Sequence, residues 1–299
     1  MKKIALITNF NIPDKVNAAI AVVQKLQQHG CEVITPAYNR EKIARHRFAR
    51  GKLELTYVSQ DAMYSEAELL IILGGDGTVL TSMHRYGLLD VPFFGVNFGH
   101  LGYLTECDPQ DTEAYIDAVL EDRCTLEERI VLEGTLCSGE EKTNFVGINE
   151  AVIHRAALNR ALRFSISVNG NIIHNFAGDG ILVATPTGST AYNISAGGPV
   201  LMPASDCFVI TPICSQYRSS CPLVVSAKDV IEISIRELPH FIPGSDSPPV
   251  MDVDSFARLT VQPGSSVTFR KAEQKVRMLK LSSESFYIAL KKKLSSNGG

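Results

Sequence analysis

Residues 71–80 read IILGGDGTVL and place one carboxylate, Asp76, among glycines directly after an apolar run. Glycines let backbone N–H groups approach phosphate oxygens closely, and a helix after such a turn adds partial positive charge at its N-terminus. The turn lacks the lysine of G-x-x-x-x-G-K-[ST], and the chain has no G-x-G-x-x-G, so neither common nucleotide fingerprint applies. The pattern indicates a phosphate site that carries an acid, or a tight turn in which Asp76 or Thr78 only caps a helix.

A second candidate is the hydroxyl-rich loop in DGILVATPTGSTAYNISAGGPV, residues 179–200. The strand-like run ILVAT leads into hydroxyls and backbone donors between Thr185 and Tyr192. Such a loop can hold ribose hydroxyls and phosphate oxygens without net charge, and a polar turn without a ligand is the alternative. A serine hydrolase is not indicated, because the loop is not G-x-S-x-G and no histidine is placed as a base.

Two shorter stretches accompany these loops. GINEA at 147–151 sets an amide and a carboxylate, Asn149 and Glu150, side by side, which suits sugar hydroxyls or a metal. GVNFGHLGYLTE at 95–106 places three glycines around aromatic residues, and alone it is a common strand exit.

The elements that must position these residues differ between the two halves of the chain. In the first 125 residues, apolar runs of strand length (KKIALIT, CEVIT, LLIIL, VPFFGV) alternate with helix patterns at 14–29 and 111–122. This alternation predicts a doubly wound parallel sheet, whose carboxyl edge binds ligands.

From about residue 126 the chain has short segments rich in Val, Ile, Thr and Phe, which predict a mainly β domain. Asn169-Gly170 between two β-prone runs predicts a two-residue hairpin turn. The proline-rich segment 238–249 predicts an exposed loop, and residues 283–294 an amphipathic helix that packs back on the first domain.

Composition excludes several classes of protein. A length of 299 residues predicts two domains, and a net charge of -3 gives no overall attraction to nucleic acid or anionic membrane. No apolar stretch is long enough to span a bilayer and no apolar leader opens the chain, so we expect a cytoplasmic protein. The seven cysteines form no C-x-x-C pair, and we expect Cys207, Cys214 and Cys221 to be small core residues.

Together and in this order, GGDGT at 74–78, Asn149-Glu150 and TPTGSTAY at 185–192 resemble the NAD kinase family from the first strand to about residue 280. GGDGT alone is shared with diacylglycerol and sphingosine kinases, so the other two motifs point to the dinucleotide branch. The resemblance implies an N-terminal Rossmann-like α/β domain at 1–125, joined by a returning helix at about 282–296. It also implies a β-rich C-terminal domain at 126–281, with the nucleotide site between the domains.

The resemblance also implies an activity and a set of site residues. Such enzymes are transferases that move the γ-phosphoryl of ATP or another donor to the 2′-hydroxyl of the adenosine ribose of NAD, giving NADP. Asp76 would be the catalytic general base and Tyr103, where the family commonly has phenylalanine, would lie beside the adenine. The other implied contacts to the substrates are Gly74, Gly75, Gly77, Thr78, Asn149, Glu150, Asp179, Thr187, Thr190, Ala191, Tyr192 and Ser195.

The expected cofactor is Mg²⁺, bound mainly through the donor phosphates, and no protein metal ligand is predicted. The resemblance implies a homodimer or homotetramer, and from the net charge we expect no nucleic-acid or membrane partner. Whether the donor is ATP or polyphosphate, and whether NADH is accepted, stays open.

Three departures from the family pattern leave alternatives open. The segment PICSQYRSSCP has Gln216 where the family has histidine, and Cys221 in a usual Arg-Pro position; Phe256 replaces an amide. A diverged NAD(P)-binding homologue with weak or no activity is therefore one alternative. Another kinase of the GGDGT superfamily, such as a lipid kinase, is a second.

Overall fold

The computed structural model describes residues 2–84, 91–98, 102–156, 161–217, 220–236, 248–281 and 285–296. Two compact units emerge from the contacts, one of residues 1–128 and 276–299 and the other of residues 129–275. The chain passes between them within its two longest strands, β6 (Thr125–Ser138) and β17 (Ser266–Lys280). The domain bounds expected from the sequence stay a prediction.

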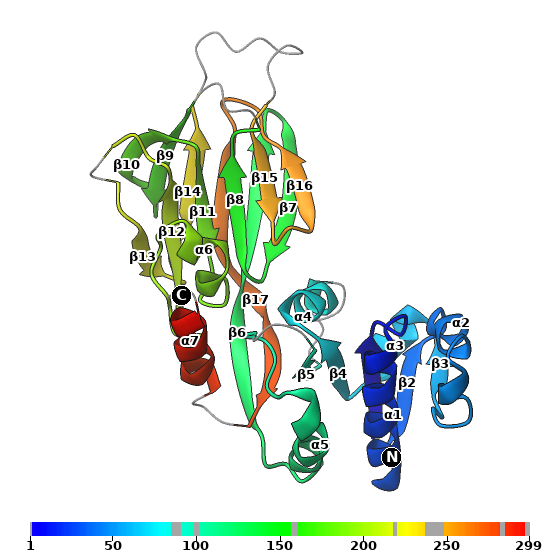
Figure 1. Ribbon diagram of the computed structural model, residues 1–299. Coiled ribbons are helices and arrows are strands. Elements are labelled where there is room, and N and C mark those ends of the chain that lie inside the picture. The colour runs from blue at the N-terminus through cyan, green and yellow to red at the C-terminus, as the bar shows by residue number, and fades with distance from the viewer. Residues whose placement is uncertain are drawn as a thin grey trace. The chain divides into compact units, whose positions relative to one another are not determined.

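Unit 1 is built on a parallel sheet in the order β5-β4-β1-β2-β3, with the end of β17 beside β5 (Figure 1). Its strands are β1 (Lys3–Thr8), β2 (Glu32–Pro36), β3 (Thr56–Val58), β4 (Leu69–Gly74) and β5 (Phe93–Asn97). Every residue of β4 and β5 is buried, as expected of central strands covered on both faces. The carboxyl ends of β1, β4 and β5 therefore meet at one edge of the sheet.

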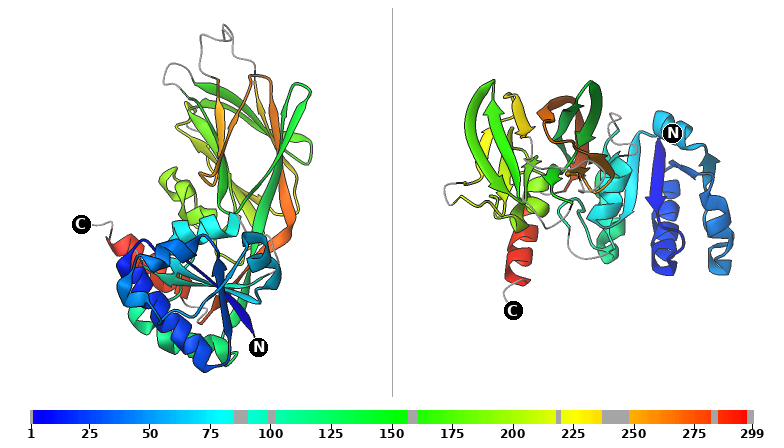
Figure 2. Two further views of the ribbon diagram at one scale, coloured as in Figure 1. Left: turned by 90° about the vertical axis from the view of Figure 1, so that its right-hand side faces the viewer. Right: turned by 90° about the horizontal axis from the view of Figure 1, so that it is seen from above.

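Helices cover this sheet because their apolar residues recur at helical spacing. In α1 (Pro13–Gln28) the buried positions include Val16, Ala19 and Val23, and the helix is followed by Gly30 at φ 73°. Helices α1 and α5 (Thr112–Leu120) lie side by side (Figure 2). The other helical elements of unit 1 are α2 (Asn39–Ala44), η1 (Arg47–Ala49), α3 (Gln60–Glu66), α4 (Asp76–Ser82), η3 (Pro109–Asp111) and α7 (Ser285–Ser296).

Unit 2 is a β-sandwich whose two sheets share one apolar core. The first sheet contains β10-β9-β14-β17 in that order, with β6 paired to β17 and β7 paired to β6. The second has the order β13-β12-β11-β8-β15-β16. The remaining strands are β7 (Glu141–Gly147), β8 (Glu150–His154), β9 (Leu162–Val168), β10 (Asn171–Gly178), β11 (Gly180–Ala184), β12 (Cys207–Ile213), β13 (Leu223–Ser226), β14 (Ile231–Ile235), β15 (Val250–Val253) and β16 (Ala257–Thr260); η4 (Gly188–Thr190) and α6 (Tyr192–Ser195) follow β11.

The predicted hairpin is confirmed: β9 and β10 pair antiparallel around Asn169-Gly170, with φ of 50° and 79°. Positive φ at both turn residues is what a type I′ turn requires. The cysteine prediction is wrong for two residues: Cys214 and Cys221 are exposed, and Cys207 is only half-buried. Cys214 comes directly after β12, at φ 46°, so it belongs to the loop and not to the core.

Some expectations fall on residues outside the described part of the chain. These are most of the proline-rich loop, at 237–247, and the first residues of the last helix, at 282–284. None of the described helices combines the length and the hydropathy needed to cross a bilayer.

Candidate active site

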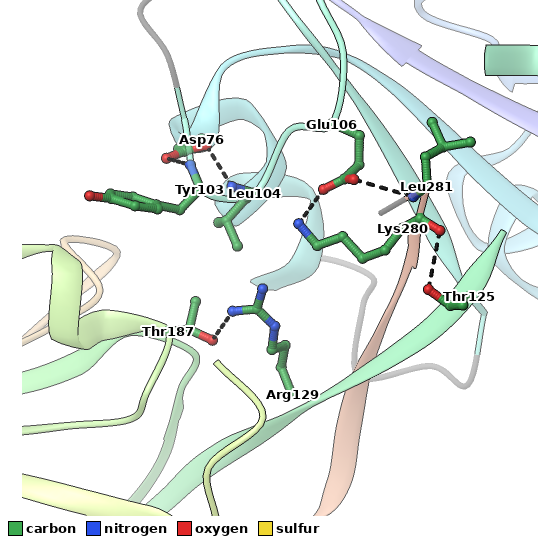
Figure 3. A network of polar contacts seen from close by, with 9 residues as sticks. All are labelled: Asp76, Tyr103, Leu104, Glu106, Thr125, Arg129, Thr187, Lys280 and Leu281. Atoms are coloured by element: carbon green, nitrogen blue, oxygen red, sulfur yellow. Dashed lines mark hydrogen bonds and ion pairs between the residues drawn. The ribbon is translucent and has the colours of Figure 1, made fainter. Parts of the chain in front are cut away.

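The Asp76 carboxylate is fixed by two backbone donors at the carboxyl end of β4. Tyr103 N–H donates to Oδ2 at 2.8 Å and Leu104 N–H donates to Oδ1 at 3.0 Å (Figure 3). Gly75 is the N-cap residue of α4, and the Asp76 carboxylate accepts hydrogen bonds from two residues outside that helix, so Asp76 does more than cap α4. Asp76 instead joins the turn after β4 to the chain after β5.

Glycines give this carboxylate its room. A Cβ on Gly102 would lie 1.9 Å from Asp76 Oδ1, so only glycine lets the two segments approach this closely. A Cβ on Gly74 would collide with the side chain of Thr78, whereas Gly75 and Gly77 have open space where a Cβ would be. The turn is therefore tightly packed at Gly74 and leaves free space beside Gly75 and Gly77.

The chain after β5 is anchored by a buried ion pair. Glu106 accepts a hydrogen bond from Lys280 Nζ near the end of β17, and the two side chains are 0% and 5% exposed (Figure 3). Burial raises the pKa of Glu106, and the Lys280 charge opposes that shift. The pair holds the segment that carries the N–H donors of Asp76.

We expect Glu106→Gln to lower the free energy of unfolding by about 3 kcal/mol, because it leaves the buried Lys280 charge without its counter-ion. Urea unfolding of the two proteins measures this. The double variant Glu106→Leu with Lys280→Met should recover most of the loss. A loss from Glu106→Gln below about 1 kcal/mol, typical of an exposed pair, would contradict the assignment.

In unit 2, Asn149 and Glu150 sit at a turn whose backbone is held by one distant carboxylate. Asp254 accepts hydrogen bonds from three successive N–H groups, those of Ile148, Asn149 and Glu150, at 2.5, 2.9 and 2.7 Å. Asp254 itself is 4% exposed and has φ 48°. Sequence reasoning missed this role, because the donors are 104 to 106 residues away and no local pattern links them.

The side chains of this turn carry buried oxygens that no described residue satisfies. Asn149 Oδ1 and Glu150 Oε2 are buried without a hydrogen-bond partner in the described parts of the chain. Burial, and next the Asp254 charge, raise the pKa of Glu150 to about 8, although the backbone N–H of Tyr192 opposes this. Unsatisfied buried acceptors are rare in folded proteins and point to a ligand that donates hydrogen bonds.

The raised pKa of Glu150 makes stability depend on pH. A carboxyl with a pKa of about 8 in the folded state, against 4.5 ordinarily, binds more protons folded than unfolded over that interval. Its contribution to stability is greatest below pH 4.5 and is lost as pH rises to about 8. We expect a slope on the order of 1 kcal/mol per pH unit, which Glu150→Gln should remove.

Thermal unfolding of both proteins without ligand, from about pH 5 to about pH 8.5, measures this slope. The upper end of the pH range in which stability is lost is defined to about one pH unit. Parallel curves for the wild type and Glu150→Gln would show that Glu150 is already ionised across this interval.

The hydroxyl loop is fastened by side chains at its back. Thr185 Oγ1 donates to Ile148 O at 2.6 Å, and Arg129, 2% exposed, donates to Thr187 Oγ1 at 3.2 Å (Figure 3). Asn193, fully buried, donates to Ser189 O and Pro199 O. A loop so closely satisfied by its own chain is rigid, which suits a binding surface.

One cavity of about 480 Å³ in unit 2 is lined by three predicted residues, Glu150, Asp179 and Tyr192, and also by Asp254. Arg155 also lines it and forms an ion pair with Asp179 at 2.9 Å. The described lining does not include four other predicted residues, Thr187, Thr190, Ala191 and Ser195. Of these, Thr187 is buried and Ser195 is exposed on α6.

The departures from the family pattern lie mainly at the surface of unit 2. Gln216 is exposed, and its backbone N–H donates to Ala177 O at 2.8 Å. Phe256 is 46% exposed. Cys214, two residues before Gln216, and Ser255, directly before Phe256, do line the cavity. The departures in these two segments can therefore alter the shape of the cavity without a contact to Asp76.

Comparison with known proteins matches nearly the whole chain to one family. Residues 4–124 match the model of the ATP-NAD kinase N-terminal domain, and residues 148–281 match that of the C-terminal domain. The NAD kinase of Natranaerobius thermophilus is 30% identical over 99% of this chain and 98% of its own length. That of Symbiobacterium thermophilum is 34% identical over 99% of both chains.

Solved structures show the same fold. Yeast NADH kinase in complex with NADH superposes with a TM-score of 0.88 at 22% identity, over 100% of this chain and 89% of that one. An Archaeoglobus fulgidus NAD kinase in complex with ATP gives 0.72 at 21% identity, over 98% of both chains. The expected α/β N-terminal and β-rich C-terminal architecture is confirmed, and the chain belongs to the NAD kinase family.

Proposed function

We propose that this protein transfers the γ-phosphoryl of ATP to the 2′-hydroxyl of the adenosine ribose of NAD, giving NADP. The observation that carries the proposal is the pair of buried, unsatisfied acceptors, Asn149 Oδ1 and Glu150 Oε2. Ribose hydroxyls both donate and accept, so they can donate to Asn149 Oδ1 and can pair with the Glu150 carboxyl whether it is ionised or protonated. Membership of the NAD kinase family supports the same substrate.

Asp76 is proposed as the general base. Its carboxylate is half-buried and oriented by two N–H groups, so it is held in place before substrate arrives. It takes the proton of the 2′-hydroxyl while that oxygen bonds to the γ-phosphorus. The bond from phosphorus to the bridging oxygen breaks, and ADP leaves with that electron pair.

The remaining predicted residues are proposed to bind and orient. Asn149 and Glu150 accept from ribose hydroxyls, and Tyr103 lies beside the adenine. Asp179 and the hydroxyl loop line the rest of the dinucleotide, with Asp179 toward the nicotinamide. The residues concerned in the loop are Thr187, Thr190, Ala191, Tyr192 and Ser195, and those in the phosphate turn are Gly74, Gly75, Gly77 and Thr78.

Mg²⁺ is proposed to enter with the donor. Among the described residues no three His, Cys, Asp or Glu side chains gather as metal ligands, and both Asp76 oxygens already accept N–H groups. Mg²⁺ keeps several waters and binds phosphate oxygens readily, so it would neutralise charge on the donor without a protein cage. A cytoplasmic location and a homodimer or homotetramer complete the proposal, supported by the family resemblance.

Incubation with NAD, ATP and Mg²⁺, followed by an NADP-specific dehydrogenase, tests the activity. We expect NADP to form, and separate arms with polyphosphate or NADH define donor and acceptor. Diacylglycerol and sphingosine serve as control acceptors. Phosphorylation of a lipid but not of NAD would contradict the proposal, as would NAD binding without any NADP.

A further inference from the structure

Helix α7 carries one half-buried lysine, Lys293, on the same face as its buried residues, and two exposed lysines, Lys291 and Lys292. Phe286 and Ala289 are buried, at 7% and 6% exposure, and Lys293 is half-buried on the same helix face, seven and four residues further on. Lys291 and Lys292 are exposed. Helical spacing would accept an apolar residue at the inward position, so a lysine there indicates a use for its charge.

Lys293 lies on the ring of the residue that holds Asp76. Its Nζ is 3.9 Å from the centroid of the Tyr103 ring, against which Phe286 also packs at 5.6 Å. The backbone N–H of Tyr103 is one of the two donors to Asp76. All of these residues belong to unit 1.

The charges of Lys293 and Asp76 act on each other. Burial lowers the pKa of Lys293, and the Asp76 charge partly offsets that shift. Burial raises the pKa of Tyr103, and the Asp76 charge raises it further. The influence of the Asp76 charge on Lys293 agrees with the geometry, in which both side chains contact Tyr103.

We propose that Lys293 binds phosphate oxygens of the phosphoryl donor next to Asp76. The GGDGT turn contains no lysine of its own, yet a nucleoside triphosphate brings several negative charges toward a carboxylate there. An ammonium group beside Asp76 offsets this repulsion, as the lysine of a P-loop does from within its own turn. Naming ATP as the donor rests on the proposed function.

The competing explanation is that Lys293 only covers the Tyr103 ring, a cation–π contact of modest strength at a partly exposed site. Lys293→Met separates the two explanations, because methionine keeps an apolar stem over the ring and removes the charge. Lys293→Arg keeps the charge. Lys291→Met removes an exposed charge from the same helix and is the matched control.

The test measures kcat and KM for ATP at saturating NAD, with NAD affinity by calorimetry and the urea midpoint for all variants. We expect Lys293→Met to lower kcat/KM for ATP about 10- to 100-fold, the effect of a charge-assisted contact. Lys293→Arg should retain most of the wild-type value, and Lys291→Met should match the wild type. NAD affinity and the urea midpoint should stay unchanged.

Equal kcat/KM for ATP in Lys293→Met and Lys291→Met would overturn the inference, as would a loss confined to NAD affinity. If Lys293→Met lowers the urea midpoint, Lys293→Gln replaces it in the same comparison. If the wild type makes no NADP, the proposed function fails, and calorimetry with Mg-ATP alone then tests the inference. Weaker Mg-ATP binding by Lys293→Met would support it, and equal binding or none by the wild type would overturn it.

Discussion

Asp76→Asn should lower kcat for NAD phosphorylation by about 10²- to 10⁴-fold, the contribution of a positioned general base. Asparagine keeps the size of the side chain and one acceptor for the Tyr103 or Leu104 N–H, but its amide cannot take the hydroxyl proton. Affinity for NAD should change by less than about threefold, because the interaction that is lost belongs to the transition state. Steady-state kinetics and calorimetry with NAD measure the two quantities.

The alternative is that Asp76 has only a structural role, since its hydrogen bonds to the Tyr103 and Leu104 N–H groups join two loops of unit 1. If Asp76 only joins the loops, Asp76→Asn should lower the urea midpoint and leave kcat within about tenfold of the wild type. Glu106→Gln is a suitable comparison, since it weakens the same loop from a residue that is not proposed to touch substrate. A kcat loss in Asp76→Asn no larger than in Glu106→Gln would remove Asp76 as the base.

Local signals in the sequence were enough to predict the elements that carry the candidate site. The run LLIILG is unbroken by charged or polar side chains, as is typical of a buried parallel strand, and it forms β4 with all of its residues buried. Asn169-Gly170 likewise predicts its own turn, because both residues tolerate positive φ. Such signals involve residues a few positions apart.

The supports of the site could not be predicted in this way. Asp254 holds a turn more than 100 residues earlier, and Glu106 pairs with a lysine 174 residues later. Residues that pair over such separations have no fixed spacing in the sequence, so no local pattern predicts that they pair. Lys293 lies within the helix predicted at 283–294, but that prediction did not single it out, and its inward position is known from the structure. The roles carried over from the family resemblance stay predictions until variants are measured.

The cysteine error has a physical cause. We expected Cys207, Cys214 and Cys221 to be small core residues, but only Cys207 lies within a strand. β12 ends at Ile213, and the chain then leaves the sheet through a residue at positive φ. Strand ends are set by pairing partners, which the local sequence does not contain.

Asp254→Ala should lower the free energy of unfolding by about 5 kcal/mol, since it orphans three successive backbone donors and each costs about 1 to 3 kcal/mol. Asp254→Asn keeps the shape and part of the acceptor capacity, so a loss of about 2 to 3 kcal/mol is expected. With Asp254→Asn the turn that carries Asn149 and Glu150 loosens, and KM for NAD should rise more than kcat falls. The pKa of Glu150 should fall from about 8, because a negative charge that opposes its ionisation is gone.

Asp229→Asn is the matched control for that variant. Asp229 also accepts a backbone N–H, from Ser226 at 3.1 Å, but at an exposed turn. Its replacement should cost less than about 1 kcal/mol and leave NAD affinity unchanged. Urea unfolding, NAD calorimetry and the pH dependence of stability distinguish the cases. An unaltered KM for NAD in a folded Asp254→Asn protein would show that the Asn149-Glu150 turn keeps its geometry without the carboxylate. An unaltered dependence of stability on pH would show that the Asp254 charge does not raise the pKa of Glu150.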